Sequence, residues 1–202
     1  YKGVPSEAGV PLVADMSSDI LSKKFDSSPF TLIYAGAQKN MGPAGTVMYA
    51  FDKSAMGKTG RNIPSYLDLE VHLSKDSMFN TPPVFSVFTT LLTLRWLKNL
   101  GGIEAIEQRN NAKAELIYNE IDRNPLFTGH ADIDSRSTMN ATFKLIDESH
   151  NEAFNQAWAK EGISGINGHR SIGGYRASMY NALPIESVQV LVDVMNEFER
   201  TR

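Results

Sequence analysis

The 202-residue sequence predicts an α/β protein in two parts, a mainly parallel sheet flanked by helices and then a smaller α+β domain. Short apolar runs of strand length occur along the chain, and longer segments with apolar residues at helical spacing lie among them. A double glycine, Gly101-Gly102, separates three such runs from a later part in which strands and helices alternate. We therefore place the two parts at residues 1–100 and 101–202.

Three apolar runs in the first part are predicted as strands, at Val10–Asp15, Phe30–Ala35 and Gly45–Phe51. The first run is continuously apolar, which is typical of a strand buried in a parallel sheet. Residues 36–45 are too rich in glycine for a helix interior. A tight turn that contains Lys39 is expected there.

The chain is polar and irregular from residue 57 to 77, and the Pro82-Pro83 pair stops any regular element. A long helix is predicted from Val84 to Leu100, with Gly101-Gly102 as its C-cap. The apolar residues that recur at helical spacing in it, which we interpret as core, are Phe85, Phe88, Leu92 and Trp96.

The second part is predicted to begin with an amphipathic helix at Ile103–Ile121. Strands and helices then alternate up to the end, and the loop before the last strand is rich in glycine and basic residues. The expected strands are Met139–Leu145 and Tyr175–Tyr180, and the expected helices are Asn151–Glu161 and Ile185–Arg202.

The composition narrows the possible functions. Cysteine is absent, so the chain has neither disulfides nor thiolate metal ligands. A formal net charge of -3 gives no electrostatic reason to expect nucleic acid or an anionic membrane as a partner, and no apolar run is long enough to span a bilayer. The lack of cysteine is compatible with a cytoplasmic protein. Residues 1–5 read as the middle of a loop, so we expect a piece of a longer chain.

Lys39 lies on a glycine-rich turn between two apolar runs, which is an unusual place for a solvated lysine. Apolar surroundings disfavour an ammonium group, and the neutral amine is a nucleophile that can form an imine with an aldehyde cofactor. The alternative is a lysine whose stem packs on the turn while its head reaches water.

Asp15 ends the first apolar run, where an unpaired carboxylate would be costly, so a cationic partner is expected. Pyridoxal 5′-phosphate (PLP) needs an acid that keeps its pyridine nitrogen protonated. An acid on one strand and Lys39 after the next strand can approach one ring from opposite sides. The alternative for Asp15 is the N-cap of a helix that begins at Ser17 or Ser18.

Five ordered segments resemble the phosphoserine aminotransferases, a family of class-V, fold-type I PLP enzymes. The resemblance runs from about Val10 to the C-terminus. It implies the C-terminal half of the PLP-binding large domain followed by the small domain. The segments are residues 15–18 (DMSS), 34–45 (YAGAQKNMGPAG), 78–83 (MFNTPP), 168–178 (GHRSIGGYRAS) and 180–184 (YNALP).

The resemblance assigns cofactor roles to matching residues. Lys39 would form the covalent link to PLP and move the proton during catalysis, and Asp15 would pair with the pyridinium nitrogen. Ser17 and Gln38 would hydrogen-bond the cofactor phosphate.

Two further residues, Asn80 and Thr81, would by resemblance reach the same phosphate from the partner subunit of a homodimer. A turn that leads into the following helix, with Thr81 as its N-cap, is the simpler interpretation. Both interpretations can hold together, because caps and phosphate donors use the same exposed groups.

The basic loop around residue 170 suits a substrate with two anionic groups, since arginine binds carboxylates and phosphates through a planar fork. By resemblance, Arg176 takes the α-carboxylate, while His169 and Arg170 take a phosphate. A solvated basic loop is the alternative. The residues for which we expect no metal or substrate role are His72, His130, His150, Arg61 and Arg136.

The implied activity is transfer of the amino group of L-glutamate to 3-phosphohydroxypyruvate, which gives O-phospho-L-serine and 2-oxoglutarate. Bacterial members of the family often also make 4-phosphohydroxy-threonine for pyridoxine synthesis. The absence of cysteine disfavours a cysteine desulfurase, and His169-Arg170 disfavours a serine–glyoxylate aminotransferase. A non-catalytic protein with the same fold is a further alternative, which Lys39, Asp15 and Arg176 disfavour.

The family's chain is longer than this one. We expect its N-terminal part to be missing here, together with an aromatic residue that stacks on the cofactor and a glycine-rich phosphate turn. Residues 1–202 alone are therefore expected to be inactive.

Overall fold

The structure is a computed structural model that describes residues 4, 9–58 and 60–202. Most of the loop expected at residues 1–5 lies outside this range. The described chain forms two compact units, one from Val4–Leu21 and Phe25–Asn99, and one that combines Ser22–Lys24 with Leu100–Arg202. None of the described helices is both long and apolar enough to cross a bilayer.

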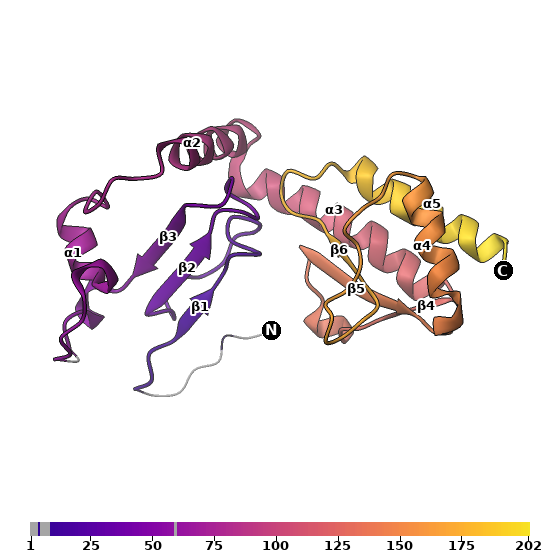
Figure 1. Cartoon of the computed structure of the whole chain (residues 1–202), viewed down its shortest axis with the longest axis horizontal. Helices are drawn as coiled ribbons and strands as arrows, with labels where there is room; N and C mark the ends of the chain where they lie inside the picture. The colour runs from indigo at the N-terminus through magenta and orange to yellow at the C-terminus, as the bar shows by residue number, and fades with distance from the viewer. Residues whose placement is uncertain (1–3, 5–8, 59) are drawn as a thin grey trace. The chain divides into compact units, whose positions relative to one another are not determined.

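The first unit contains a sheet in the order β1-β2-β3, with β1 at Val13–Asp15, β2 at Leu32–Gly36 and β3 at Val47–Phe51 (Figure 1). β1 pairs parallel to β2, and β2 pairs antiparallel to β3. Because parallel strands end at the same edge of a sheet, the turn after Asp15 and the turn that bears Lys39 lie next to each other.

The core of the first unit is small and sits beneath this edge. Its buried residues come from β2 and from the two turns, whereas β1 has Val13 and Asp15 exposed. The expectation that Asp15 ends a buried strand is therefore wrong for the described chain, because nothing in this unit covers that side of β1. The buried core residues are Ile20, Ile33, Ala35, Ala37 and Met41.

The helix predicted after the two prolines is present as α2, at Val84–Asn99, but the prediction of its buried face is wrong. Phe85 is 73% exposed and Trp96 is 38% exposed. The face that packs instead carries small side chains. A Cβ at Gly42 would lie 2.9 Å from Thr90 Oγ1, and one at Gly45 would lie 2.7 Å from Ser86 Oγ, so the turn glycines allow the helix to approach closely.

The described part of the segment predicted to be irregular contains a 3-10 turn at Ser65–Leu67 and one short α-helix, α1, at Leu69–Ser74. Asp68 caps it by accepting a hydrogen bond from the Glu70 N–H, 2.9 Å from N to Oδ1. A helix of less than two turns gives little periodic signal in sequence, which explains why it was not predicted.

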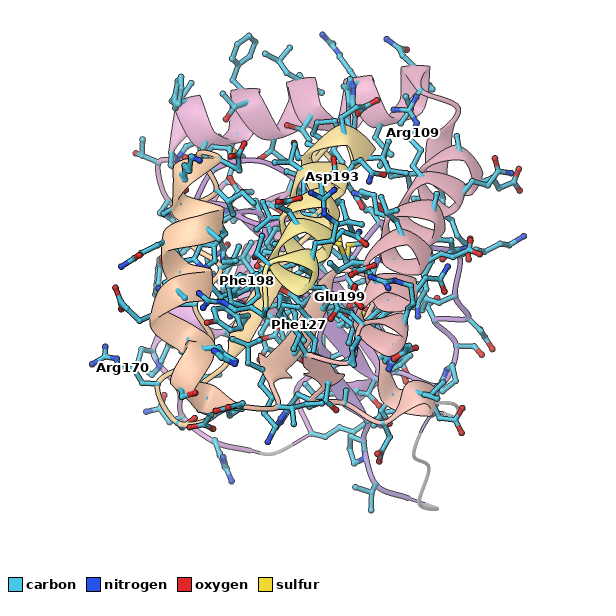
Figure 2. The ribbon with its side chains drawn as sticks, turned by 90° about the vertical axis from the view of Figure 1, so that its right-hand side faces the viewer. Arg109, Phe127, Arg170, Asp193, Phe198 and Glu199 are labelled. Carbon is cyan, nitrogen blue, oxygen red and sulfur yellow. The ribbon has the colours of Figure 1, made fainter. Side chains whose placement is uncertain are left out.

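The second unit is an antiparallel sheet in the order β4-β5-β6 with three helices on one face. The aromatic core of this unit is centred on Phe154. Phe127 and Phe198, labelled in Figure 2, place their ring centroids 5.0 and 5.2 Å from it. The elements are α3 (Gly102–Arg123), β4 (Phe127–Gly129), β5 (Asn140–Leu145), α4 (Asn151–Lys160), β6 (Tyr175–Ser178) and α5 (Ile185–Arg200).

These elements confirm the alternation predicted for the second part, with one addition, the three-residue strand β4. Side chains alternate strictly across β5 and β6: Phe143 and Tyr175 face the helices, while Thr142 and Arg176 lie on the other face. The face without helices is thus polar, and it carries one of the residues expected to bind substrate.

Arg136, for which no substrate role was expected, anchors its loop to α3. Its guanidinium donates to both carboxylate oxygens of Asp122, at 2.7 and 2.6 Å, and lies 4.6 Å from the centre of the Tyr118 ring. The hydrogen bond from Arg136 holds the pKa of Asp122 below its ordinary value.

Candidate active site

The Asp15 carboxylate is the centre of a hydrogen-bonded turn at the end of β1. Its Oδ1 accepts from the Ser17 backbone N–H at 2.9 Å and from the Ser17 hydroxyl at 2.6 Å. These bonds lower the pKa of Asp15, and a hydrogen bond from Tyr34 and the positive charge of Lys39 act in the same direction. Residues 17–21 form turns and no helix begins there, so the N-cap interpretation is wrong.

Ser17 is almost buried, and its hydroxyl joins the two strands. Besides donating to Asp15, Ser17 Oγ accepts a hydrogen bond from the Gly36 N–H at the end of β2, 3.0 Å away. The single hydroxyl proton is therefore already used. A contact between Ser17 and a cofactor phosphate would need this proton to turn away from Asp15.

Lys39 lies on a compact turn in which the Ala37 carbonyl accepts from the N–H groups of Met41 and Gly42, at 3.0 and 2.9 Å. The Lys39 side chain is exposed, so the apolar surroundings expected for it are not formed by the described residues. Its neighbour Gln38 is also exposed and folds back over Gly36. A Cβ at Gly36 would lie only 2.4 Å from Gln38 Oε1, so the glycine makes room for the amide.

Asn40 joins the Lys39 turn to the Asp15 turn, a role that sequence analysis missed. It is 5% exposed, and its Nδ2 donates to the carbonyl oxygens of Ser18 and Ile20, both at 3.1 Å. The only signal in the sequence is a second polar residue beside Lys39 in a turn that is otherwise rich in glycine and alanine. The result is that the backbone after Asp15 is held against the backbone around Lys39.

Asn80 and Thr81 lie before α2 and are both exposed. Asn80 Nδ2 donates to the Thr81 carbonyl at 3.2 Å. The helix begins at Val84, as predicted, and the carbonyl of Pro83 accepts the Val87 N–H at 3.1 Å. Thr81 is therefore not the N-cap of α2, and its side chain and that of Asn80 face solvent.

In the second unit, the basic loop closes on itself between two glycines. The Gly168 N–H donates to the Gly174 carbonyl at 2.8 Å, and the His169 carbonyl accepts from the N–H groups of Ile172 and Gly173, at 2.9 and 2.8 Å. A Cβ at Gly174 would lie 2.6 Å from the Phe143 carbonyl oxygen, so only glycine allows the loop to sit this close to β5.

The imidazole of His169 is held by Ser171, whose Oγ lies 2.7 Å and whose N–H lies 3.3 Å from Nδ1. Because Nδ1 accepts from the backbone, the proton of the neutral ring is on Nε2, the outer nitrogen. Arg170 is exposed and projects from the surface (Figure 2). This loop therefore presents donor groups to solvent.

Arg176 lies on the polar face of β6, opposite Thr142 of β5, and is exposed. Within the described part of the chain, neither Arg170 nor Arg176 forms an ion pair with a carboxylate. A cavity of about 170 Å³ beside the loop is lined by His169 and Arg176, and also by His130 and Lys144. These positive and donor groups suit an anionic ligand, and the described residues contain no cluster that could hold a metal ion.

Residues 4–191 match the model of the family described as "Aminotransferase class-V". The chain belongs to the class-V aminotransferase family. Its structure is similar to that of a phosphoserine aminotransferase from Bacillus circulans subsp. alkalophilus, with a TM-score of 0.94 and 43% identity over 100% of this chain and 56% of the other. The fold is that of the fold-type I PLP aminotransferases.

Curated relatives of this class-V aminotransferase include the phosphoserine aminotransferase of Flavobacterium psychrophilum, which is 64% identical over 96% of this chain and 54% of its own length. That of Bacillus cereus is 47% identical over 98% of this chain and 55% of its own. The chain therefore spans about half the length of the curated relatives it matches. A PLP-bound phosphoserine aminotransferase from Trichomonas vaginalis is similar, with a TM-score of 0.85 and 32% identity over 95% of this chain and 55% of the other.

The residues at the edge of the first sheet fit PLP chemically. The pKa of Asp15 is lowered, so the carboxylate is ionised at neutral pH and is suited to a protonated pyridine nitrogen. Lys39 supplies the only side-chain amine on the adjacent turn of residues 37–46, and it is exposed and open to an aldehyde. Gln38, Asn80 and Thr81 supply neutral donors of the kind that bind a phosphate.

Proposed function

We propose that the full-length protein transfers the amino group of L-glutamate to 3-phosphohydroxypyruvate and so produces O-phospho-L-serine and 2-oxoglutarate. The observation that carries this proposal is the ionised Asp15 carboxylate beside the Lys39 turn, in a chain whose relatives are named phosphoserine aminotransferases. PLP, when bound, supplies an aldehyde for the amino group and a ring that withdraws electrons from the substrate Cα.

In this proposal Asp15 binds the pyridine nitrogen and keeps its proton in place through a charge-assisted hydrogen bond. Ser17 and Tyr34 hold that carboxylate in position through the bonds described above. Lys39 would hold the cofactor covalently through Nζ, and, once the amino group of the substrate has taken its place, the freed Nζ would take the proton from the substrate Cα. Because the Lys39 side chain is exposed, its amine has room to swing between these two atoms.

The cofactor phosphate is bound in this proposal by Ser17 and Gln38, and by Asn80 and Thr81 of a second copy of the chain. Asn80 and Thr81 are exposed, so their donor groups face solvent within their own unit. This exposure supports the proposal that they bind the phosphate of a second copy. The proposed enzyme is therefore a homodimer. Ser17 takes part only after its hydroxyl proton turns from Asp15 to the phosphate.

Substrate selection is assigned to the second unit. Arg176 binds the α-carboxylate that both amino acids share, and His169 and Arg170 bind the phosphate that only phosphoserine carries. The unpaired state of both arginines among the described residues supports this, because each can give its whole fork of donors to an anion. Ser171 orients the His169 ring so that Nε2 donates outward.

Further parts of the proposal concern the protein as a whole. Residues 1–100 form the C-terminal half of the PLP-binding large domain, and residues 101–202 form the small domain. The protein is cytoplasmic, and it also serves pyridoxine synthesis by making 4-phosphohydroxy-threonine.

The substrate assignment is tested by comparing amino donors in the full-length enzyme. Amino transfer to 2-oxoglutarate is measured with phosphoserine, serine and alanine. We expect kcat/KM for phosphoserine to exceed that for serine by at least about a hundredfold, because one phosphate contributes two charge-assisted contacts of about 1.5–3 kcal/mol each. Similar values for serine and phosphoserine would favour a serine–glyoxylate type of enzyme instead.

A further inference from the structure

A lysine is fully buried in the second unit at a place that the proposed chemistry does not use. Lys113 on α3 is 1% exposed, and its Nζ donates to the carbonyl oxygens of Met179, Tyr180 and Leu183, at 3.0, 2.9 and 3.2 Å. All three ammonium protons thus have acceptors. The three carbonyls belong to the segment that follows β6.

Asn110 extends this arrangement one turn earlier on the same helix. It is 1% exposed, and its Nδ2 donates to Asn181 Oδ1 at 2.9 Å and to the Ser22 carbonyl at 3.0 Å. We call Asn110 and Lys113 together the α3 clamp. The clamp makes four hydrogen bonds to residues 179–183.

Stability alone is a poor explanation for a lysine at this position. Burial of an ammonium group is costly, and desolvation together with the Arg109 charge lowers the pKa of Lys113 to about 8. A methionine of similar length would fill the same space without that cost. What the lysine adds is three directed bonds to backbone carbonyls, of which the Tyr180 carbonyl also accepts the Leu183 N–H at 2.9 Å.

The clamp acts on β6 because of where this strand lies. β6 is at the end of the sheet order, so only one side pairs with a strand, β5. Near its beginning, the Arg176 N–H donates to the Ile166 carbonyl at 2.7 Å. At its other end the chain leaves the sheet at Met179, where Lys113 holds it. The backbone of Arg176 is therefore one fixed point on this edge strand, and the strand end held by Lys113 is the other.

We propose that Asn110 and Lys113 are positioning residues that hold β6 so that the Arg176 guanidinium meets the substrate α-carboxylate. This inference rests on the proposed function of Arg176. In this inference the clamp touches neither the substrate nor the cofactor. Its effect is to remove the freedom of the strand end, because a small misplacement of a substrate-binding group is enough to weaken a directed ionic contact.

The experiment compares Lys113→Met with Arg123→Met in the full-length holoenzyme. Arg123 is a matched control on α3, since it bonds Glu120, Asn196 and Glu199 and touches no residue of the segment after β6. Two quantities are measured: hydrogen–deuterium exchange of residues 175–184, and the KM of glutamate and of phosphohydroxypyruvate. Arg176→Lys is measured alongside.

We expect Lys113→Met to speed exchange in residues 175–184 and to raise KM for both substrates about tenfold, the scale of one weakened charge-assisted bond, with a smaller change in kcat. Arg123→Met should leave both quantities unchanged. If Lys113→Met does not fold, Asn110→Ala is used, which keeps the lysine and removes the bond to Asn181. It should raise KM for both substrates equally, and by a smaller factor than Lys113→Met.

Each remaining outcome has a distinct meaning. A folded Lys113→Met variant with wild-type exchange and wild-type KM overturns the positioning role, as does equal injury by Arg123→Met. If Arg176→Lys leaves KM unchanged while Lys113→Met still speeds exchange, the clamp stands as a device that orders β6. The proposed function of Arg176 is then what fails.

Discussion

The Ser17 hydroxyl donates to the Asp15 carboxylate across 2.6 Å, and the same oxygen accepts the N–H of Gly36 from the neighbouring strand. One small side chain thus ties the end of β1 to the end of β2, the two places from which Asp15 and the Lys39 turn extend. This arrangement keeps the carboxylate ionised and aimed before any ligand arrives.

Lys39→Ala should abolish amino transfer in the full-length enzyme, because no other amine lies on the turn beside Asp15 to bind the cofactor carbon and move the proton. Lys39→Arg should behave in the same way, since a guanidinium stays protonated at any accessible pH. The measurement is a single turnover with glutamate. Loss of less than about a hundredfold would be too small for a residue with this role.

Asp15→Asn should leave the cofactor bound but slow the reaction with glutamate by about a hundredfold or more, the usual cost of removing one group that stabilises charge in the transition state. Stopped-flow measurement of one half of the reaction gives this rate directly. Ser17→Ala is the control, because it keeps the carboxylate and removes only its hydroxyl donor, so its effect should be smaller. An unchanged rate in Asp15→Asn would mean that Asp15 only accepts the hydrogen bonds of its turn and has no catalytic role.

The edge at which these residues meet could be predicted from the sequence, because apolar runs that end in Asp15 and in the Lys39 turn mark the ends of adjacent strands. The role of Asn40 could not be predicted in this way. Its two acceptors are carbonyls about twenty residues earlier, and hydrogen bonds of that kind leave no periodic pattern.

The buried face of α2 and the burial of Lys113 show where pattern rules fail. The apolar stripe of α2 predicted a packed face. Instead, Ser86 and Thr90 pack against Gly42 and Gly45, because these glycines have no side chain to hold the helix away from the turn. Lys113 is surrounded in sequence by residues typical of a solvated helix face. Its burial follows from three carbonyls of a segment more than sixty residues later, which only the tertiary fold brings near.

Asn40→Ala should lower the free energy of unfolding by about 1–3 kcal/mol, because the Ser18 and Ile20 carbonyls lose their common, buried donor. Asn111→Ala is the matched control, an asparagine that is exposed on α3 and should change stability by less than about 0.5 kcal/mol. Urea denaturation of both variants checks this. If Asn40→Ala were as stable as the wild type, water would replace the Asn40 amide without a loss of stability.

His169→Ala and Arg170→Ala should raise KM for phosphoserine roughly ten- to a hundredfold, the cost of one charge-assisted contact, while KM for glutamate stays nearly constant. Arg176→Ala should raise both, because each amino acid carries an α-carboxylate. Steady-state kinetics with the two donors separate these cases. Equal losses for both donors in all three variants would show that the phosphate is bound elsewhere.

The ionisation of Lys113 should make stability depend on pH in a defined window. Its pKa is lowered from 10.5 to about 8 in the folded chain, so below pH 8 the folded and unfolded chains both carry the proton and this group gives no slope. Between pH 8 and 10.5 only the unfolded chain keeps it. The unfolded state then binds more protons, and the free energy of unfolding rises with pH.

The size of this rise is bounded by the lowering of the pKa, which corresponds to at most about 3.5 kcal/mol at roughly 1.4 kcal/mol per pKa unit. The measurement is the difference in unfolding free energy between the wild type and Lys113→Met at pH 7 and at pH 10.5, so that other titrating groups cancel. Lys144→Met, the same substitution at an exposed site on β5, is the control. If the difference in unfolding free energy were the same at pH 7 and at pH 10.5, the three carbonyl acceptors would hold the ammonium form as strongly as water does. The α3 clamp would then keep its full set of bonds throughout the alkaline range, and β6 would stay fixed there.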